Sequence, residues 1–300
     1  MRVYIKEHKS HAGFWIYRGY FKAWKSLGYD PSFYKNIEDI GEEKDFFLMC
    51  NDSDIKQENI KILERAKRAF IFVQPNTFPM PWGKHPNYVS LCHESVIREI
   101  NEMKNVFQWT FADVEKDFYY LWNNPSTVPL AFDSESYIYK KRDYKYDVCY
   151  IGGRANNGFD EKYKIMMNTF SHFMNSGLRC AFFVGKNLTH EQEQDILCSS
   201  RIALNIHDEY QRKLSLDTNE RTFKSLGMTG QMVSDKINQI KNIFPDIDIE
   251  MSLEYKEIKD KVDSILSCPL SEQELIKEKN REIINNKHTY KNRILKMLGE

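Results

Sequence analysis

The feature that most constrains the fold is an alternation of short apolar runs with helical segments, which occurs in two series. The apolar runs lie at residues 2–6, 45–50, 69–73, 106–111 and 128–132, and then at 147–151, 180–184, 202–206 and 230–234. Helical spacing of apolar residues predicts helices at 14–27 and 159–176. Short apolar strands that alternate with helices form parallel sheets covered on both faces. The sequence therefore predicts an α/β protein with two doubly wound parallel-sheet domains.

The charged stretch at residues 140–146 (KKRDYKY) separates the two series and is interpreted as a linker. We expect an amino-terminal domain over residues 1–143 and a carboxy-terminal domain over 144–286. Sheets of this kind bind ligands at the carboxyl ends of their strands. The expected site is therefore a cleft between the two domains.

Composition excludes several classes of protein. The chain has 43 Lys and Arg residues and 43 Asp and Glu residues, so its net charge is zero. This balance argues against a protein whose main partner is a nucleic-acid backbone. A local basic patch is still compatible with a net charge of zero. The six cysteines form no CxxC pair, which favours a reducing compartment. No signal peptide or apolar run of about 20 residues is found, so we expect a cytoplasmic protein.

Strong cofactor motifs are missing from the sequence, since neither GxxxxGK[ST] nor GxGxxG occurs. A weaker signal is the turn Gly152-Gly153-Arg154 between an expected strand and helix. Glycines let a ligand approach the backbone, and the start of a helix offers free N–H groups to a phosphate. The turn is interpreted either as a phosphate-binding loop or as a tight connection that binds nothing.

Two further segments carry candidate ligand-binding residues. Asn205 and His207 come near the carboxyl end of the expected strand at 202–206. Arg221 and Lys224 are three residues apart, on one face of a short expected helix. Two cations near a helix start favour a diphosphate. The alternatives, a core-edge histidine and a solvated basic face, stay open on these residues alone.

From Tyr146 to the carboxyl terminus the sequence resembles the CgeB-like group of GT-B glycosyltransferases. The matching segments are, in order, YDVCYIGGR, RCAFFVGK, SSRIALNIHD, NERTFKSLGMTGQMVSD and HTYKNR. The resemblance implies two Rossmann-like domains facing across a cleft, with a last helix in 287–300 that crosses back to the first domain. It also implies a metal-independent hexosyl- or pentosyltransferase that moves a sugar from a nucleotide sugar, UDP- or GDP-linked, to a carbohydrate or other hydroxyl acceptor. No resident cofactor is expected.

In that pattern the second domain holds the donor. The donor-binding residues expected from the resemblance and from the charge of a leaving diphosphate are Gly152, Gly153, Arg154, Lys186, Asn205, His207, Asn219, Arg221, Thr222, Phe223 and Lys224. One position departs from the pattern, because such families often have Glu where this chain has Lys224. A lysine cannot accept hydrogen bonds from ribose hydroxyls, so the identity of the nucleotide is in doubt.

The first domain is expected to hold the acceptor. His11 is the candidate general base, His8 and Ser10 are further acceptor-side candidates, and Trp82 is the candidate for stacking on an acceptor sugar. The alternatives are a spectator histidine and a tryptophan packed within its own loop.

Three other functions stay open. A phage-type transferase acting on hydroxymethylated DNA bases needs a basic face, which Lys22, Lys25, Arg65, Lys67 and Arg68 would supply. An inactive nucleotide-sugar-binding module is compatible with Lys224. A metal-dependent enzyme would use the Asp–Ser–Asp triplet, in which Asp52 and Asp54 suit a hard cation. For that triplet we favour helix capping by Ser53 or Asp54.

Overall fold

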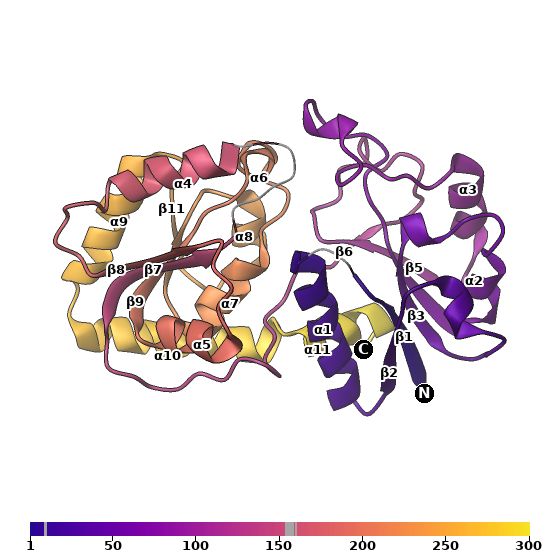
Figure 1. Ribbon diagram of the computed structural model, residues 1–300, viewed down its shortest axis with the longest axis horizontal. Coiled ribbons are helices and arrows are strands. Elements are labelled where there is room, and N and C mark those ends of the chain that lie inside the picture. Colours follow the sequence, from indigo (N-terminus) through magenta and orange to yellow (C-terminus); the bar gives the residue numbers. More distant parts are fainter. Residues whose placement is uncertain (9–10, 154–158, 160) are drawn as a thin grey trace. The chain divides into compact units, whose positions relative to one another are not determined.

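The computed structural model describes residues 1–8, 11–153, 159 and 161–300. The chain divides into two compact units: unit 1 comprises Met1–Pro129 and Tyr290–Glu300, and unit 2 comprises Leu130–Thr289. Each unit holds one sheet whose paired strands all run parallel, with helices around it (Figure 1). The predicted α/β fold class is confirmed. Within the described residues, no helix combines the length and the apolar character needed to cross a membrane.

The sheet of unit 1 has the strand order β2-β1-β3-β4-β5-β6. Its strands are β1 (Arg2–Lys6), β2 (Asp30–Tyr34), β3 (Phe47–Asn51), β4 (Arg68–Phe72), β5 (Val106–Thr110) and β6 (Ser126–Thr127). The central strands β3 and β4 are almost continuously buried, as expected for a parallel sheet with both faces covered. All carboxyl ends lie at one edge of this sheet.

Two helices from opposite ends of the chain cover one face of this sheet. They are α1 (His11–Ser26) and α11 (Tyr290–Leu298), which lie side by side in Figure 1. The rings of Tyr20 and Tyr290 lie 4.8 Å apart between centroids. Gly19 makes this approach feasible, because a β-carbon there would come within 2.5 Å of the Tyr290 ring. The last helix is thereby part of unit 1.

The other face of the unit 1 sheet is covered by α2 (Lys61–Arg65) and α3 (Glu94–Glu102). Leu63, Ile97 and Ile100 from these helices share one buried apolar cluster with Leu48 and Ile71 of the sheet. Three short 3-10 turns, η1 (Ile37–Ile40), η2 (Asp52–Asp54) and η3 (Trp82–Lys84), lie in the connections. Both faces of the sheet are thus buried.

Two strands of unit 1 differ from the sequence-based expectation. β2 was not predicted, because its sequence DPSFY contains Pro31 and lacks an apolar run. Proline is tolerated there since β2 is an edge strand that pairs only with β1. The expected strand at 128–132 is replaced by β6, which ends before Val128 and Pro129.

The sheet of unit 2 has the strand order β11-β10-β9-β7-β8. Its strands are β7 (Tyr146–Gly152), β8 (Cys180–Val184), β9 (Ser200–Asn205), β10 (Met232–Ser234) and β11 (Glu250–Met251). The apolar runs predicted for β7, β8, β9 and β10 are therefore confirmed as strands. Because all pairs are parallel, the residues that follow β7, β9 and β10 meet at one edge of the sheet.

Helices cover both faces of the unit 2 sheet. On one face α4 (Glu161–Ser171) and α9 (Tyr255–Ser267) share an apolar cluster with the strands. On the other face lie α5 (His190–Cys198), α7 (Glu220–Met228) and α10 (Leu270–Lys287). The remaining helices are α6 (Glu209–Leu214) and α8 (Asn238–Ile243).

Helix α4 is shorter than the predicted range of 159–176. Ile165, Met166 and Phe170 are buried as expected, but Tyr163 and Met167, which belong to the predicted apolar stripe, are exposed. The buried face of α4 is therefore narrower than the apolar face that the sequence predicted for this helix. The charged stretch at 140–146, which we interpreted as a linker, lies within unit 2.

Candidate functional site

The candidate site lies at the carboxyl edge of the unit 2 sheet and is organised by Arg221, in the first turn of α7. The Arg221 Nε donates to the carbonyl oxygen of Ile151 on β7, at 2.7 Å. Its Nη1 donates to the Asn205 side-chain oxygen and to the Ile206 carbonyl, at 3.3 and 3.2 Å. The guanidinium thus bridges the ends of two neighbouring strands. Among the described residues, no carboxylate forms an ion pair with Arg221, although its charge is felt by the carboxyl group of the preceding residue, Glu220.

The position of Arg221 also explains why the first residue of the Gly152-Gly153 turn is a glycine. A β-carbon on Gly152 would overlap the Arg221 Nη2 and would lie 2.7 Å from its Cζ. The guanidinium lies over the ring of Tyr150, 4.7 Å from the ring centroid. In contrast, a β-carbon on Gly153 would meet nothing within 4 Å among the described residues. The structure therefore brings Gly152 and Arg221 into direct contact.

A buried chain of polar side chains holds the strand end in place behind Arg221. Asn205 donates to Thr222 Oγ1 at 2.7 Å, and Thr222 shares a hydrogen bond with Thr218. Thr218 Oγ1 lies 2.8 Å from His207 Nε2. Asn205, His207, Thr218 and Thr222 are all at most 2% exposed. Such a network, once satisfied, rigidifies the groups at its end.

Asp235, after β10, closes this network at its far end. Its Oδ2 accepts from the His207 backbone N–H at 2.5 Å, and its Oδ1 accepts from Arg212 at 2.7 Å. His207 Nδ1 lies 3.5 Å from the same Oδ2. Burial lowers the pKa of His207, and Asp235 opposes that shift only in part. We therefore assign His207 a neutral ring and a role in holding Asn205, through Thr218 and Thr222.

Lys224 lies one helical turn beyond Arg221 but is paired. Its Nζ lies 2.5 Å from Glu193 Oε1 on α5, and 5.2 Å from the centroid of the Tyr137 ring. The Tyr137 hydroxyl donates to the same carboxylate. Burial opposes ionisation of Glu193, but Lys224 and Tyr137 outweigh it and lower its pKa. Lys224 is therefore ion-paired, whereas Arg221 has no ion-pair partner in the part of the chain that the structure describes.

The other residues expected at the donor site are placed as follows. Asn219 precedes α7, and its Oδ1 is a buried acceptor that receives no hydrogen bond from the described residues. Thr222 is buried in the polar network, and Phe223 is a core residue that packs on Phe244. The side chain of Phe223 is therefore not available to line a pocket, because it is fully buried. Lys186 follows β8 and is exposed, and Arg154 lies outside the described residues.

The acceptor-side candidates belong to unit 1. Trp82 is 3% exposed, so its ring is packed in the protein and does not present a face for stacking on a sugar. His8 stacks on Tyr17, with 5.7 Å between ring centroids, and burial lowers its pKa. His11 is the first residue of α1, and Ser10 lies outside the described residues.

The Asp–Ser–Asp triplet serves the local fold. Asp52 is fully buried, and its Oδ2 accepts from the Gln74 backbone N–H and from the Ser90 hydroxyl. Asp54 caps η2 by accepting from the Asn51 N–H at 3.0 Å, and it pairs with Lys6 at 2.9 Å. Asp54 thus caps the 3-10 turn that contains it, whereas α2, the helix that follows, has Ile60 as its N-cap and no side-chain cap among the described residues, so the predicted capping of that helix by Ser53 or Asp54 is wrong. Within the described part of the chain, no group of three or more His, Cys, Asp or Glu is arranged to hold a metal ion.

Sequence reasoning missed several residues of the unit 2 site. Tyr150 lies two residues before Gly152 on β7, and strand alternation alone puts both on one face of the sheet. Asp235 directly follows an expected strand, so its position at the carboxyl edge was a usable signal. Glu193 gave no such signal, because only the packing of α5 on α7 brings it to Lys224.

Comparison with known proteins places this geometry in context. Residues 153–299 match the family model described as glycosyl transferase-like. A search of curated proteins found no match. Among solved structures, TarM of S. aureus is 11% identical with a TM-score of 0.57; the match covers 88% of this chain, which spans 57% of the TarM chain.

Two other solved structures match the whole length of the chain. One is an alpha-glucosyltransferase in complex with UDP and a 13-mer DNA containing an HMU base, at 10% identity and a TM-score of 0.61, covering 100% of this chain and 98% of the other. The second is a glycosyltransferase involved in avilamycin A biosynthesis, at 8% identity and a TM-score of 0.55, covering 100% and 99%. At such identities the likeness shows the fold. The chain thus has the GT-B glycosyltransferase fold, and over residues 153–299 it is similar to the glycosyl transferase-like family, which together support a sugar transferase.

Proposed function

We propose that the protein is a glycosyltransferase of the CgeB-like group that moves a hexosyl or pentosyl unit from a nucleotide sugar to an acceptor hydroxyl. Unit 2 binds the donor, UDP- or GDP-linked, and unit 1 binds the acceptor. UDP is present in the solved structure of the alpha-glucosyltransferase that shares this fold.

The observation that carries the proposal is that Arg221, at the carboxyl edge of the unit 2 sheet, forms no ion pair with any residue that the structure describes. Three oxygen acceptors, from Ile151, Asn205 and Ile206, orient the guanidinium without neutralising it. Gly152 lets the guanidinium lie directly against the end of β7, because a β-carbon there would overlap it. A cation held in a fixed orientation at the carboxyl edge of a parallel sheet suits a diphosphate.

This arrangement has a direct use in sugar transfer. When the glycosidic bond to the diphosphate breaks, negative charge grows on the leaving phosphate oxygen. A preorganised cation stabilises that charge without having to reorient during the reaction. In our proposal Arg221 supplies this stabilisation, Lys186 adds a second positive charge, and no metal ion is required. The buried network from Asn205 to Asp235 keeps Arg221 in position.

Donor binding is tested by thermal unfolding of the full chain with UDP, GDP, ADP and CMP sugars in turn. A ligand at 100 times its dissociation constant stabilises a protein by about 2.7 kcal/mol. We expect one donor class to raise the unfolding temperature, and Arg221→Ala to abolish that rise. Arg98→Ala is the matched control, because Arg98 is an exposed arginine of unit 1 paired with Glu94.

Arg221→Lys separates charge from geometry, since lysine keeps the positive charge but cannot make the same set of oriented hydrogen bonds. We expect it to retain part of the donor-induced shift. An undiminished shift in Arg221→Ala would contradict the assignment of the site. Sugar transfer that persists in EDTA supports the metal-independent mechanism, and activity restored only by a divalent cation would contradict it.

An inactive nucleotide-sugar-binding module is the second candidate, favoured by the pairing of Lys224 with Glu193 at a position where such families often carry Glu. Donor hydrolysis or transfer by the wild-type protein would exclude it. Binding without turnover on any offered acceptor would favour it.

A further inference from the structure

Two neighbouring helices of unit 1 form a layer without acidic side chains. Residues 8–29, which include all of α1, contain Lys9, Arg18, Lys22 and Lys25 but no Asp or Glu. Helix α11, Tyr290–Leu298, contains three Lys or Arg and again no acidic residue. The whole chain has equal numbers of acidic and basic residues. The positive charge is therefore concentrated on this side of the unit 1 sheet.

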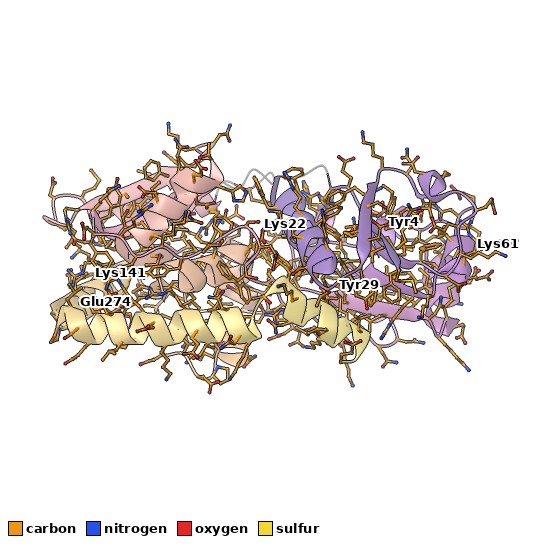
Figure 2. All side chains as sticks on the ribbon, turned by 90° about the horizontal axis from the view of Figure 1, so that it is seen from below. Tyr4, Lys22, Tyr29, Lys61, Lys141 and Glu274 are labelled. Carbon is orange, nitrogen blue, oxygen red and sulfur yellow. The ribbon has the colours of Figure 1, made fainter. Side chains whose placement is uncertain are left out.

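The cations of α1 are spaced so that they share the outer face of the helix. Arg18, Lys22 and Lys25 follow positions i, i+4 and i+7. The opposite face, with Tyr20 and Trp24, is fully buried. Arg18 and Lys25 are exposed, and among the described residues neither has a carboxylate within ion-pair distance. Lys22, which is labelled in Figure 2, lies on the same helix and is half-buried.

An exposed aromatic ring adjoins these cations. Phe14 is 38% exposed at the amino-terminal end of the same face. The Arg18 guanidinium lies over it, 4.9 Å from the ring centroid, and 5.9 Å from that of Trp15. Leaving a phenylalanine ring this exposed costs hydrophobic stabilisation. A flat aromatic beside a row of cations is the combination that binds a nucleic-acid strand, through stacking and phosphate contacts.

From these observations we propose that the outer face of α1 binds a nucleic-acid strand with an accessible base. Phe14 and Arg18 stack on the base, and Lys22 and Lys25 contact the phosphates that follow it. Binding of the strand does not depend on the proposed function. If the protein is the proposed glycosyltransferase, the acceptor is a hydroxyl group of the nucleic acid, and this second statement rests on the proposed function. Binding to an anionic membrane is the competing explanation for the same cations. Binding to a membrane would not require the contact between the Phe14 ring and the Arg18 guanidinium.

Two other basic residues suggested by the sequence, Arg65 and Arg68, do not join this face, and Lys67 lies between α2 and β4, outside α1. Arg65 donates to the Gly41 carbonyl and lies near Glu42. Arg68 donates to the Leu298 carbonyl and lies over the rings of Phe70 and Phe107. Their charges are used inside unit 1, so the proposal does not include them.

The test is fluorescence anisotropy of the full chain with labelled single-stranded DNA and with the matching duplex, as a function of salt. The variant carries Arg18→Gln, Lys22→Gln and Lys25→Gln. Because about 0.7 counterions are released per phosphate contact on a single strand, and two lysines are assigned to phosphates, we expect the logarithmic salt slope to fall by about 1.4. Phe14→Ala should weaken single-strand binding by about tenfold and affect the intact duplex less.

The matched control carries Lys44→Gln, Lys61→Gln and Lys104→Gln, three exposed lysines of unit 1 outside α1 and α11. It makes the same change in net charge, and we expect an unchanged salt slope. Equal losses in both triple variants, or no DNA binding by the wild type, would overturn the proposal. The proposal would also be overturned if the protein bound phosphatidylserine vesicles more tightly than DNA and Phe14→Ala left the affinity for DNA unchanged.

Donor-induced thermal shifts measured on the same variants keep the two proposals distinguishable. If the α1 triple variant loses DNA binding but keeps its donor shift, it is folded and the surface is separate from the donor site. If the wild type binds DNA but no donor, the surface stands and the proposed function fails.

Discussion

Arg221 lies so close to Gly152 that the glycine has no room for a β-carbon. These residues are far apart in the sequence, yet the contact links the end of β7 to the first turn of α7. The hydrogen bond from Arg221 to the Ile151 carbonyl fixes this link. This hydrogen bond joins the two segments that the sequence suggested for phosphate binding.

Gly152→Ala is therefore expected to displace Arg221. Overpacking a tight contact costs about 1–3 kcal/mol, so the free energy of unfolding should fall by that amount. The donor-induced thermal shift should shrink as well. Gly153→Ala serves as the comparison for stability, because its β-carbon would meet no described atom within 4 Å. Equal stability of both variants would show that Arg221 does not occupy this position in solution.

Replacing the buried carboxyl of Asp52 should change the pH dependence of stability. Burial raises the pKa of Asp52 from 3.8 to about 6, against hydrogen bonds from Ser90 and Gln74 that oppose the shift. The folded state thus binds the proton more tightly than the unfolded chain, and stability falls as pH rises from about 4 to about 6. Asp52→Asn removes this loss and keeps an acceptor oxygen.

We expect Asp52→Asn to stabilise the protein by about 1–3 kcal/mol above pH 6 and by much less below pH 4. The measurement is urea unfolding over that range. Asp52→Ala is the control, since it also removes the acceptor for Ser90 and should not stabilise. The interpretation is wrong if the Asn variant is the less stable protein at pH 7.5.

His207 should show the opposite dependence on pH. Burial lowers its pKa below the usual 6.5, so the unfolded chain takes up the proton first as pH falls. Stability attributable to His207 is therefore present above pH 6.5 and decreases below it, by at most about 1.4 kcal/mol per pH unit. His207→Gln should reduce the stability difference between pH 7.5 and pH 5.5. Ring ¹⁵N shifts of His207 that titrate at or above 6.5 would contradict this.

The pair formed by Lys224 and Glu193 is testable by charge exchange. The side chains are 16% and 14% exposed, so removing one partner leaves a mostly buried charge uncompensated. Lys224→Glu alone should destabilise unit 2 by about 2 kcal/mol or more, because two carboxylates then face each other. Combining it with Glu193→Lys should restore part of that loss.

A double-mutant cycle on thermal unfolding measures this coupling, for which we expect about 1–3 kcal/mol. Lys213 and Glu209 form an exposed pair of the same type on α6 and provide the control, for which about 0.5 kcal/mol is expected. Coupling of similar size in the two pairs would mean that the Lys224 pair is not shielded from solvent.

The sequence by itself determined the α/β class and most of the strands. β9 is an apolar run because a strand buried on both faces needs apolar residues at successive positions, and the edge strand β8 is an apolar run that is only partly buried. It also pointed to Arg221 and the Gly152-Gly153 turn, since charge and glycine content are local properties.

Tertiary structure decided what local pattern could not encode. β2 is a strand only because β1 offers it a pairing edge, and Phe223 is a core residue because Phe244 covers it. Likewise, Arg221 and Lys224 are two cations of the same helix, and among the described residues only Lys224 is met by a carboxylate, that of Glu193 on α5, with which it forms an ion pair. Such differences depend on contacts between residues distant in sequence, which become fixed only when the helices pack on the sheet.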